Sequence, residues 1–218
     1  NKINVKQVEV IFPATGGVTG ISFCPECKAL QSTRSASQNQ CFKTEFGMEI
    51  KGSTTIASDD FNEDLDEGEP MRGWSNAEVD ASEKKFGQFL GRYGRDMESP
   101  HKEYRVPRDV DRVTFSIDFY EIDLWDNDDV CIFVDGETIN LGPFSSNVDE
   151  GTFNGTTQLG IEWMCDSVSK PNHLGFNSDY MDQLHRVVIK VPDTTGLFAD
   201  GKLRLTLQAH VTEKLEDQ

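Results

Sequence analysis

The chain has 218 residues, with 21 basic against 38 acidic side chains, which gives a formal net charge of −17 at pH 7. This charge argues against nucleic acids and anionic membrane surfaces as partners, and it makes divalent cations the natural counter-ions. No apolar run approaches the roughly 20 residues of a membrane helix, and the length suffices for one sizeable hydrophobic core.

Residues 1–55 are expected to form a small β region at the N-terminus. The segment 4–12, NVKQVEVIF, is predicted to be a strand because apolar and polar residues alternate along it. Three of the five cysteines lie between this segment and residue 55. We expect a disulfide between Cys41 and either Cys24 or Cys27, and a zinc site is the alternative, weakened because the usual second pair of cysteines is missing. The odd number of cysteines leaves one free or paired with another chain.

Residues 56–218 are expected to form the main domain, a two-sheet antiparallel jelly-roll sandwich. Between Val113 and Phe119 every second residue is apolar, so one face of this strand is core and the other is solvated. The pair Asp135-Gly136 is a strong hairpin signal between two strands. Helical periodicity is almost absent, and the runs that alternate across the chain are 42–50, 111–122, 129–136, 185–192 and 202–211. The sequence therefore predicts an all-β protein.

The decapeptide 119–128, FYEIDLWDND, places several carboxylates beside two aromatic side chains at the end of a predicted strand. Three interpretations compete: a cation site, a catalytic pair of carboxylates, or a solvated hairpin end. Calcium takes six to eight oxygen ligands in tolerant geometry, and Asp123 and Asp126 can converge if the strand turns after Trp125. A second acidic loop, within 57–76, can complete the shell. The candidate Ca²⁺ ligands are Asp60, Glu67, Asp123, Asp126 and Asp128.

The motifs GWS, FGQFLGRYG, VTFSIDFYEIDLWDND and IFVDGETINLG, in this order, resemble those of a calcium-binding jelly-roll module of secreted and cell-surface proteins of bacteria, algae and other protists, related to the MAM and laminin-G type sandwiches. The resemblance covers about residues 57–212 and implies calcium ligation by Asp60, Asp123 and Asp126. Leu124 stands where serine is common in such modules, which removes one candidate hydroxyl ligand. The chain ends where a further strand is expected, so we expect a piece of a larger protein or a domain that a partner completes.

The segment EIDLWD is also similar to the E-I-D-x-x-E strand of laminarinase-type β-glucanases, which are two-sheet jelly rolls. That resemblance implies Glu121 as nucleophile, Asp123 as the residue that tunes it, and Asp126 as general acid. Asp126 replaces a glutamate of that family and is one methylene shorter, which would hold the acid back from the leaving oxygen. Hydrolysis of β-glucans is therefore an alternative, and a protein without a catalytic site is the main expectation.

The segment 165–185 is expected to contact a ligand, because loops of about twenty residues are usually functional or mobile. A short helix that is capped by Ser178 and bridges two sheets is the alternative. Trp163 is the tryptophan most available for stacking on a sugar ring. The predicted ligand-contact residues are Trp163, Asn177, Asp179 and Tyr180.

A glycosylation sequon at Asn154, together with the clustered cysteines and the acidity, favours an extracellular or cell-surface location. We expect a non-catalytic module in which calcium rigidifies loops at one end of the sandwich, and this surface binds a glycan or a neighbouring protein subunit of a larger assembly. A structural subunit of an extracellular filament or coat is an alternative that shares the fold. Neither nucleic-acid binding nor membrane insertion is expected.

Overall fold

The computed structural model describes the chain in several segments, the longest of which is 99–169. The described residues are 3–13, 21–23, 41–43, 48–51, 53–59, 61, 73–75, 79–80, 88–93, 99–169, 171–173 and 177–210. Within them the structure consists of β-strands and turns with one 3-10 turn, η1 (Asp193–Thr195), which confirms the predicted all-β class. These segments contain no helix long and apolar enough to cross a membrane.

The larger sheet of the sandwich is antiparallel and has eight strands in the order β12-β13-β14-β9-β1-β7-β6, with β5 also paired to β1. Its strands are β1 (Ile3–Pro13), β5 (Ser53–Asp59), β6 (Val79–Asp80), β7 (Phe89–Tyr93), β9 (Arg112–Glu121), β12 (Thr152–Thr156), β13 (Glu162–Ser167) and β14 (Gln183–Pro192). The longest uninterrupted pairing joins β9 and β14, from Glu121 opposite Gln183 to Arg112 opposite Pro192. This register places the end of β9 beside the start of β14.

The second sheet has four strands in the order β11-β10-β15-β8. They are β8 (His101–Arg105), β10 (Asp126–Val134), β11 (Glu137–Ser145) and β15 (Lys202–His210). The hairpin between β10 and β11 turns at Asp135 and Gly136, with φ angles of 48° and 86°. Two positive φ angles are what a tight two-residue hairpin turn requires, so the predicted hairpin is confirmed.

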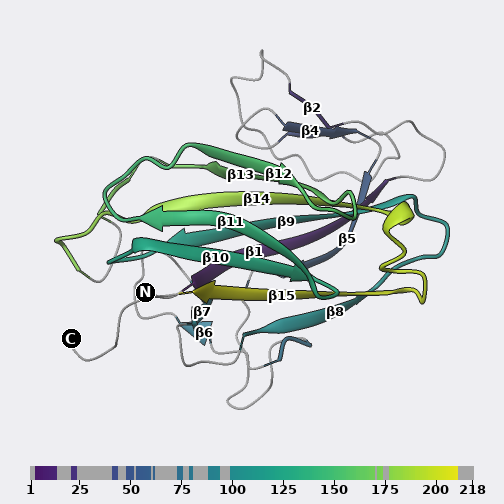
Figure 1. Cartoon of the computed structure of the whole chain (residues 1–218), viewed down its shortest axis with the longest axis horizontal. Helices are drawn as coiled ribbons and strands as arrows, with labels where there is room; N and C mark the ends of the chain where they lie inside the picture. Colours follow the sequence, from purple (N-terminus) through teal and green to yellow (C-terminus); the bar gives the residue numbers. More distant parts are fainter. Residues whose placement is uncertain are drawn as a thin grey trace.

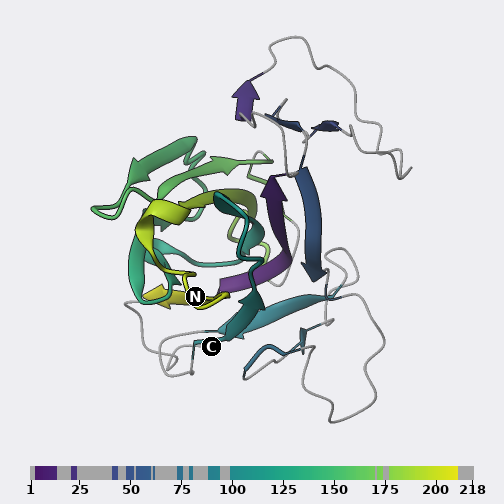
Figure 2. The same ribbon diagram turned by 90° about the vertical axis from the view of Figure 1, so that its right-hand side faces the viewer.

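The two sheets pack face to face around one hydrophobic core. Strands of both sheets run along the long axis of the molecule (Figure 1), and the view turned by 90° shows them arranged around a common interior (Figure 2). Every second residue of each central strand is buried there, for example Val113, Phe115, Ile117 and Phe119 of β9 against Val130, Ile132 and Val134 of β10. Each such side chain contributes about 1.5–3 kcal/mol through burial. The predicted two-sheet antiparallel sandwich is therefore observed.

The outer face of the large sheet carries an ion pair across β9 and β14. Arg186 Nε and Nη2 donate to the two carboxylate oxygens of Asp118, each at 2.6 Å. Both side chains are largely buried, with exposed fractions of 16% and 11%. The pairing therefore ties the two central strands together on the face opposite the core.

A third sheet of three short strands lies between β1 and β5 in the sequence. Its strands are β2 (Ile21–Phe23), β3 (Cys41–Lys43) and β4 (Met48–Lys51), in the order β2-β4-β3, so the predicted strand 42–50 is two antiparallel strands. The boundary expected near residue 55 assigned β1 to the N-terminal region. The pairing of β1 with β9 and β5 places β1 in the large sheet instead, because Val5, Val8 and Val10 are fully buried in the common core.

The segment between β13 and β14 contains an isolated bridge between Asn172 and Asp182 and a turn over 178–179. The helix that the sequence offered as an alternative after Ser178 is wrong, because the residues from Gln183 onward are already a strand paired with β9.

Candidate functional site

Three segments far apart in the sequence meet at the end of the sandwich where β9 ends and β10 begins. We call residues 122–125, 146–150 and 177–182 the loop platform. Trp125 N donates to Ser146 Oγ at 2.6 Å, and Met181 N donates to Asn147 Oδ1 at 2.9 Å. Loop N–H groups must find acceptors outside regular pairing, and short polar side chains supply them here. The platform is therefore held together by side chains that accept from the backbone of another segment.

Asp123 links all three segments of the platform. Its N–H donates to Asp182 Oδ1 at 2.9 Å, its own Oδ1 accepts from Asn177 N at 2.8 Å, and its carbonyl accepts from Ser146 Oγ. Each hydrogen bond of this kind contributes about 0.5–1.5 kcal/mol, more where a charged group takes part. Asp182, whose carboxylate accepts the hydrogen bond from Asp123 N, is fully buried.

Unusual backbone conformations gather at the same end of the molecule. The described residues include five non-glycine residues with positive φ, and three of them are Asp123 (63°), Asn127 (58°) and Asn147 (68°). Asp and Asn tolerate this left-handed region better than other side chains. Such conformations persist where surrounding contacts enforce them and are common at binding sites.

The exposed side chains of the platform mix apolar, amide and acidic groups. Large apolar side chains are exposed at three described positions, and two of these, Val148 (48%) and Met181 (36%), lie on the platform, whereas Leu159 (44%) lies in the turn between β12 and β13. The exposed polar side chains of the platform are Asn147, Asp149, Asn177, Ser178 and Asp179. An apolar pair surrounded by polar groups has the composition of a small interaction surface.

Three of the predicted ligand-contact residues, Asn177, Asp179 and Tyr180, lie together on the platform. Trp163 does not join them. It lies on β13, where a Cβ atom at Gly155 would come within 2.8 Å of its ring, and it packs against the core. The ring therefore covers the backbone of β12, and this geometry does not support Trp163 as a sugar-stacking residue.

The predicted calcium ligands are only partly described. Asp126 is exposed, and Asp123 makes the hydrogen bonds with Asp182, Asn177 and Ser146 described above. Asp128 is buried, and its Oδ2 accepts a hydrogen bond from Asp126 N at 3.2 Å. Asp60 and Glu67 lie outside the described residues. Where the structure describes side chains, no three His, Cys, Asp or Glu residues come together as a group able to hold a metal ion. The calcium site stays a prediction.

The remaining sequence predictions concern cysteines and glycosylation. Cys24 and Cys27 lie outside the described residues, and of Cys41 only its place in β3 is described, so the disulfide stays a prediction. Cys131 and Cys165 are free and buried. Asn154 is exposed in β12, which leaves it accessible to the modification that the sequon predicts.

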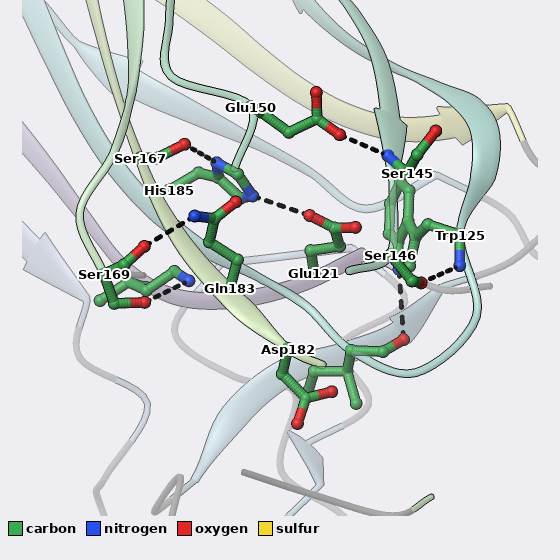
Figure 3. A network of polar contacts seen from close by, with 12 residues as sticks. Glu121, Trp125, Ser145, Ser146, Glu150, Ser167, Ser169, Asp182, Gln183 and His185 are labelled. Carbon is green, nitrogen blue, oxygen red and sulfur yellow. Dashed lines mark hydrogen bonds and ion pairs between the residues drawn. The ribbon is translucent and has the colours of Figure 1, made fainter. Parts of the chain in front are cut away.

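Beneath the platform, polar side chains fill the end of the core (Figure 3). Glu121, Gln183 and His185 are each at most 1% exposed, and their strand positions point them to the inner face. His185 Nε2 lies 3.0 Å from Glu121 Oε2. The His185 ring stacks on Phe119, with a centroid distance of 4.9 Å, and meets Phe144 edge-on at the same distance. Aromatic packing therefore fixes the imidazole that faces Glu121.

The environment of this pair disfavours charge on either partner. Burial raises the pKa of Glu121 to about 8, and the nearby charge of Asp182 adds to the shift. Burial lowers the pKa of His185 to about 4, against the opposing effect of Glu150, Asp149 and Asp166. Between these values the pair holds one proton, which the 3.0 Å contact shares.

Among the residues that the structure describes, two acceptor atoms of this cluster have no hydrogen-bond partner: Glu121 Oε1 and Gln183 Oε1. The orientation of the Gln183 amide follows from its Nε2, which donates to the carbonyl of Ser169 at 2.7 Å. An unpaired oxygen is far more costly on a buried carboxylate than on a neutral carboxyl. The cluster is therefore suited to a protonated Glu121.

The geometry gives the hydrolase alternative little support. Glu121, its implied nucleophile, is 1% exposed and faces the core between the sheets, whereas Asp126, its implied general acid, is exposed at the start of β10. A polymeric glycan would have to reach a buried carboxyl, and a retaining mechanism needs both carboxyls on one substrate about 5–5.5 Å apart.

Comparisons of the chain with protein-family models, with curated proteins and with solved structures found no match. The resemblance to calcium-binding jelly-roll modules therefore stays an expectation.

The sequence did carry a signal for the buried cluster. The apolar alternation that ends at Phe119 places Glu121 on the same inner face, two residues further on. The same alternation places Gln183 and His185 in line with Val187. The interpretation of the decapeptide 119–128 considers Glu121 together with its acidic neighbours in the sequence, and it does not lead to a pair with His185.

Proposed function

We propose that the protein is a non-catalytic β-sandwich module that binds a neighbouring protein through the loop platform. One observation carries the proposal: three segments distant in the sequence are fastened to one another by Asp123, Ser146, Asn147 and Asp182, and together they present Val148 and Met181 to solvent. A surface that is ordered before binding loses less conformational entropy when a partner docks.

A protein partner is favoured over a glycan by the kind of side chain that is exposed. Sugar rings bind to flat aromatic faces, yet Trp125 is 2% exposed and Trp163 covers Gly155. The exposed apolar groups of the platform, Val148 and Met181, are aliphatic and sit beside Asp149 and Asp179. The complementary partner has a small apolar centre with basic groups around it.

We further propose that the module is extracellular and that it binds a calcium ion. The exposed sequon residue Asn154 supports a secreted or cell-surface protein. A calcium ion held by Asp123, Asp126 and Asp60 would add to the rigidity of the platform. The protein would then serve as one unit of a surface or extracellular assembly.

The experiment compares the wild type with three variants, in each of which lysine replaces one exposed apolar residue. Val148→Lys and Met181→Lys place a positive charge on the platform, and Leu159→Lys places one on an exposed apolar residue at the far end of β12. Each protein is immobilised, the proteins retained from native extract are identified by mass spectrometry, and a glycan panel is tested in parallel. We expect one protein to be retained by the wild type and by Leu159→Lys, and lost from the two platform variants.

Equal retention by all four proteins would contradict the proposal, as would binding confined to the glycan panel. Retention of further copies of the chain through the platform would identify the protein as a structural subunit of a self-assembled filament or coat, the alternative that shares this fold.

A further inference from the structure

We propose that two copies of the chain pair edge to edge through β12, antiparallel and centred on Asn154, so that their large sheets become one continuous sheet. This inference goes beyond the proposed function, because it involves neither the loop platform nor another protein. It starts from the position of β12 at the end of the large sheet. Within the described residues β12 pairs on one side only, with β13, and Figure 2 shows the green hairpin of these two strands at the margin of the sandwich.

The backbone of β12 has three residues whose hydrogen-bonding groups face outward. Two backbone bonds mark the hydrogen-bonded positions at the ends of the β12–β13 pairing: Ser167 N donates to Gly151 O at 3.0 Å, and Thr157 N donates to Ile161 O at 2.9 Å. Such positions alternate along an antiparallel strand, so every second residue from 151 to 157 bonds to β13. The N–H and C=O groups of the residues between them point away from β13: Thr152, Asn154 and Thr156.

The side chains of these three residues are exposed, whereas those between them are partly buried. Their order, Thr-Asn-Thr, is the same in both directions of the chain. In an antiparallel pair centred on Asn154, each Thr152 therefore lies opposite Thr156 of the second copy, and the two Asn154 side chains lie opposite each other. Opposed threonines and amides form favourable cross-strand contacts. This self-complementarity favours a second copy of the chain over an unrelated strand, and a twofold axis closes the pair as a dimer.

β12 also lacks the features that commonly protect an outer strand from other chains. Charged side chains and proline at the edge of a sheet oppose pairing with a further strand. The segment TFNGT contains neither, although the chain has a formal charge of −17. The other described outer strands of the two sheets do contain them: Asp59 in β5, Asp80 in β6, Lys102, Glu103 and Arg105 in β8, and Glu137 and Pro143 in β11. Of these strands, β12 is the one best suited to pairing.

The described acids nearest to this edge do not prevent the pairing. On β13, Asp166 lies opposite Thr152, and Glu162 lies opposite Thr156. Asp166 Oδ1 accepts from Thr152 Oγ1 at 2.5 Å, and Glu162 Oε2 accepts from Lys190 Nζ at 3.3 Å. In the dimer the two β13 strands are three strand spacings apart, about 14 Å. This separation exceeds the Debye length of about 8 Å at physiological salt, so repulsion between these carboxylates is largely screened.

The predicted glycosylation of Asn154 would compete with the pairing. In this register the Cα atoms of the two Asn154 residues lie about 5.5 Å apart, with their side chains on the same face. A glycan on either copy would crowd the place where the side chain of the other copy stands. A chain glycosylated at Asn154 should therefore stay monomeric at concentrations where the unmodified chain dimerises. A glycosylated dimer with β12 paired about Asn154 would contradict this register.

Hydrogen exchange followed by NMR tests the inference on the unaltered chain. Protein made in bacteria, and therefore without the glycan, is compared between dilute solution and about 1 mM at about 0.15 M salt, because a contact through one short strand is weaker than an interface of standard size. We expect the amides of Thr152, Asn154 and Thr156 to gain protection with concentration, whereas those of Phe153 and Gly155 are protected throughout. Sedimentation equilibrium should show a monomer and a dimer over the same range.

Two variants at the centre of β12 separate backbone pairing from other contacts. Asn154→Pro removes the outward N–H group and leaves the bonds to β13 intact, since the neighbouring residues make them. Asn154→Ala is the matched control, which also loses the amide side chain but keeps the N–H group. Because two central hydrogen bonds are lost, we expect the dimer Kd of Asn154→Pro to exceed that of Asn154→Ala about tenfold or more. Asn154→Ala should stay within about fivefold of the wild type.

A wild-type chain that stays monomeric at about 1 mM would overturn the inference. A dimer without alternating protection along β12 would also overturn it, as would equal dimerisation of Asn154→Pro and Asn154→Ala. If Asn154→Pro does not fold, the exchange pattern of the wild type decides. Both variants leave the residues of the loop platform unchanged, so failure of this test and failure of the binding experiment are distinguishable.

Discussion

The carboxylate of Asp182 accepts a hydrogen bond from the backbone N–H of Asp123 at 2.9 Å, and so joins the start of β14 to the turn that follows β9. Asp123 in turn accepts from Asn177 N at 2.8 Å. The side chains of both acids therefore accept hydrogen bonds from backbone N–H groups, and the order of the loop platform depends on them.

Replacement of Asp182 tests this role. Asp182→Ala removes the acceptor of a partly buried N–H group, and we expect a loss of about 1–3 kcal/mol in the free energy of unfolding, measured by urea denaturation. Asp182→Asn keeps an oxygen at the same position and should lose less. Equal stability of Asp182→Ala and the wild type would contradict the structural role of the hydrogen bond.

The ion pair between Arg186 and Asp118 should be stronger than a typical surface pair. Its two parallel hydrogen bonds are both 2.6 Å long and largely buried, and we expect a coupling energy of about 1–3 kcal/mol in a double-mutant cycle of Asp118→Ala and Arg186→Ala. Burial and the charge of Asp118 raise the pKa of Glu9, and Arg186 opposes this shift. Arg186→Ala alone should therefore raise the pKa of Glu9 further, as an NMR titration would show. A coupling energy near zero would mean that the two side chains act independently.

The Trp163 ring lies against Gly155 and leaves no room for a side chain at this position. A Cβ atom there would approach Trp163 Cζ2 to 2.8 Å, so Gly155→Ala must displace the ring. We expect a loss of about 1–3 kcal/mol and a change in tryptophan fluorescence, with Thr152→Ala, an exposed position of the same strand, as the control. An unperturbed spectrum with full stability would show that Trp163 has room to move.

Glycosylation at Asn154 can be separated from the packing of the same strand. Asn154 and Thr156 are exposed on β12, so we expect a glycan when the chain passes through a eukaryotic secretory pathway, detected as added mass. Asn154→Gln should abolish the modification, whereas Gly155→Ala, which keeps the sequon intact, should retain it. A wild-type chain of unmodified mass would remove this support for an extracellular setting.

Calcium removal tests the predicted metal site. If Asp123 and Asp126 join Asp60 around an ion, chelator should lower the melting temperature by several degrees, since a ligand at 100 times its Kd stabilises by about 2.7 kcal/mol. Asp126→Asn should reduce the shift, and Asp200→Asn, at the opposite end of the sandwich, should leave it unchanged. Identical melting curves with calcium and with chelator would rule out a site that stabilises the fold.

Local patterns were sufficient to predict most strands but not their partners. Alternation predicts β9, β10, β14 and β15 because each strand buries one face, and the pair Asp135-Gly136 predicts the turn that joins β10 to β11. The segment that forms β1 is also recognisable. Its position beside β9 is not, because an alternating pattern states which face is buried and does not state which distant strand lies alongside.

Likewise, the sequence predicts some residues of the candidate site but not the contacts between them. Asn177 and Asp179 could be predicted because they lie in a long polar segment between two strands. The pairing of Glu121 with His185 could not, since it depends on the register that sets Gln183 opposite Glu121. The engagement of Asp123 by the backbone of Asn177 depends on how distant segments meet, which composition alone does not reveal.

The central position of β1 has a practical consequence for anyone who dissects the protein. A recombinant fragment that begins near residue 56 would lack β1, and β9 would lose one of its two neighbours. The bare N–H and C=O groups of a long apolar strand would then be open to other chains. Such a fragment should aggregate on expression, and its insolubility would reflect a missing strand rather than an inability of the sandwich to fold.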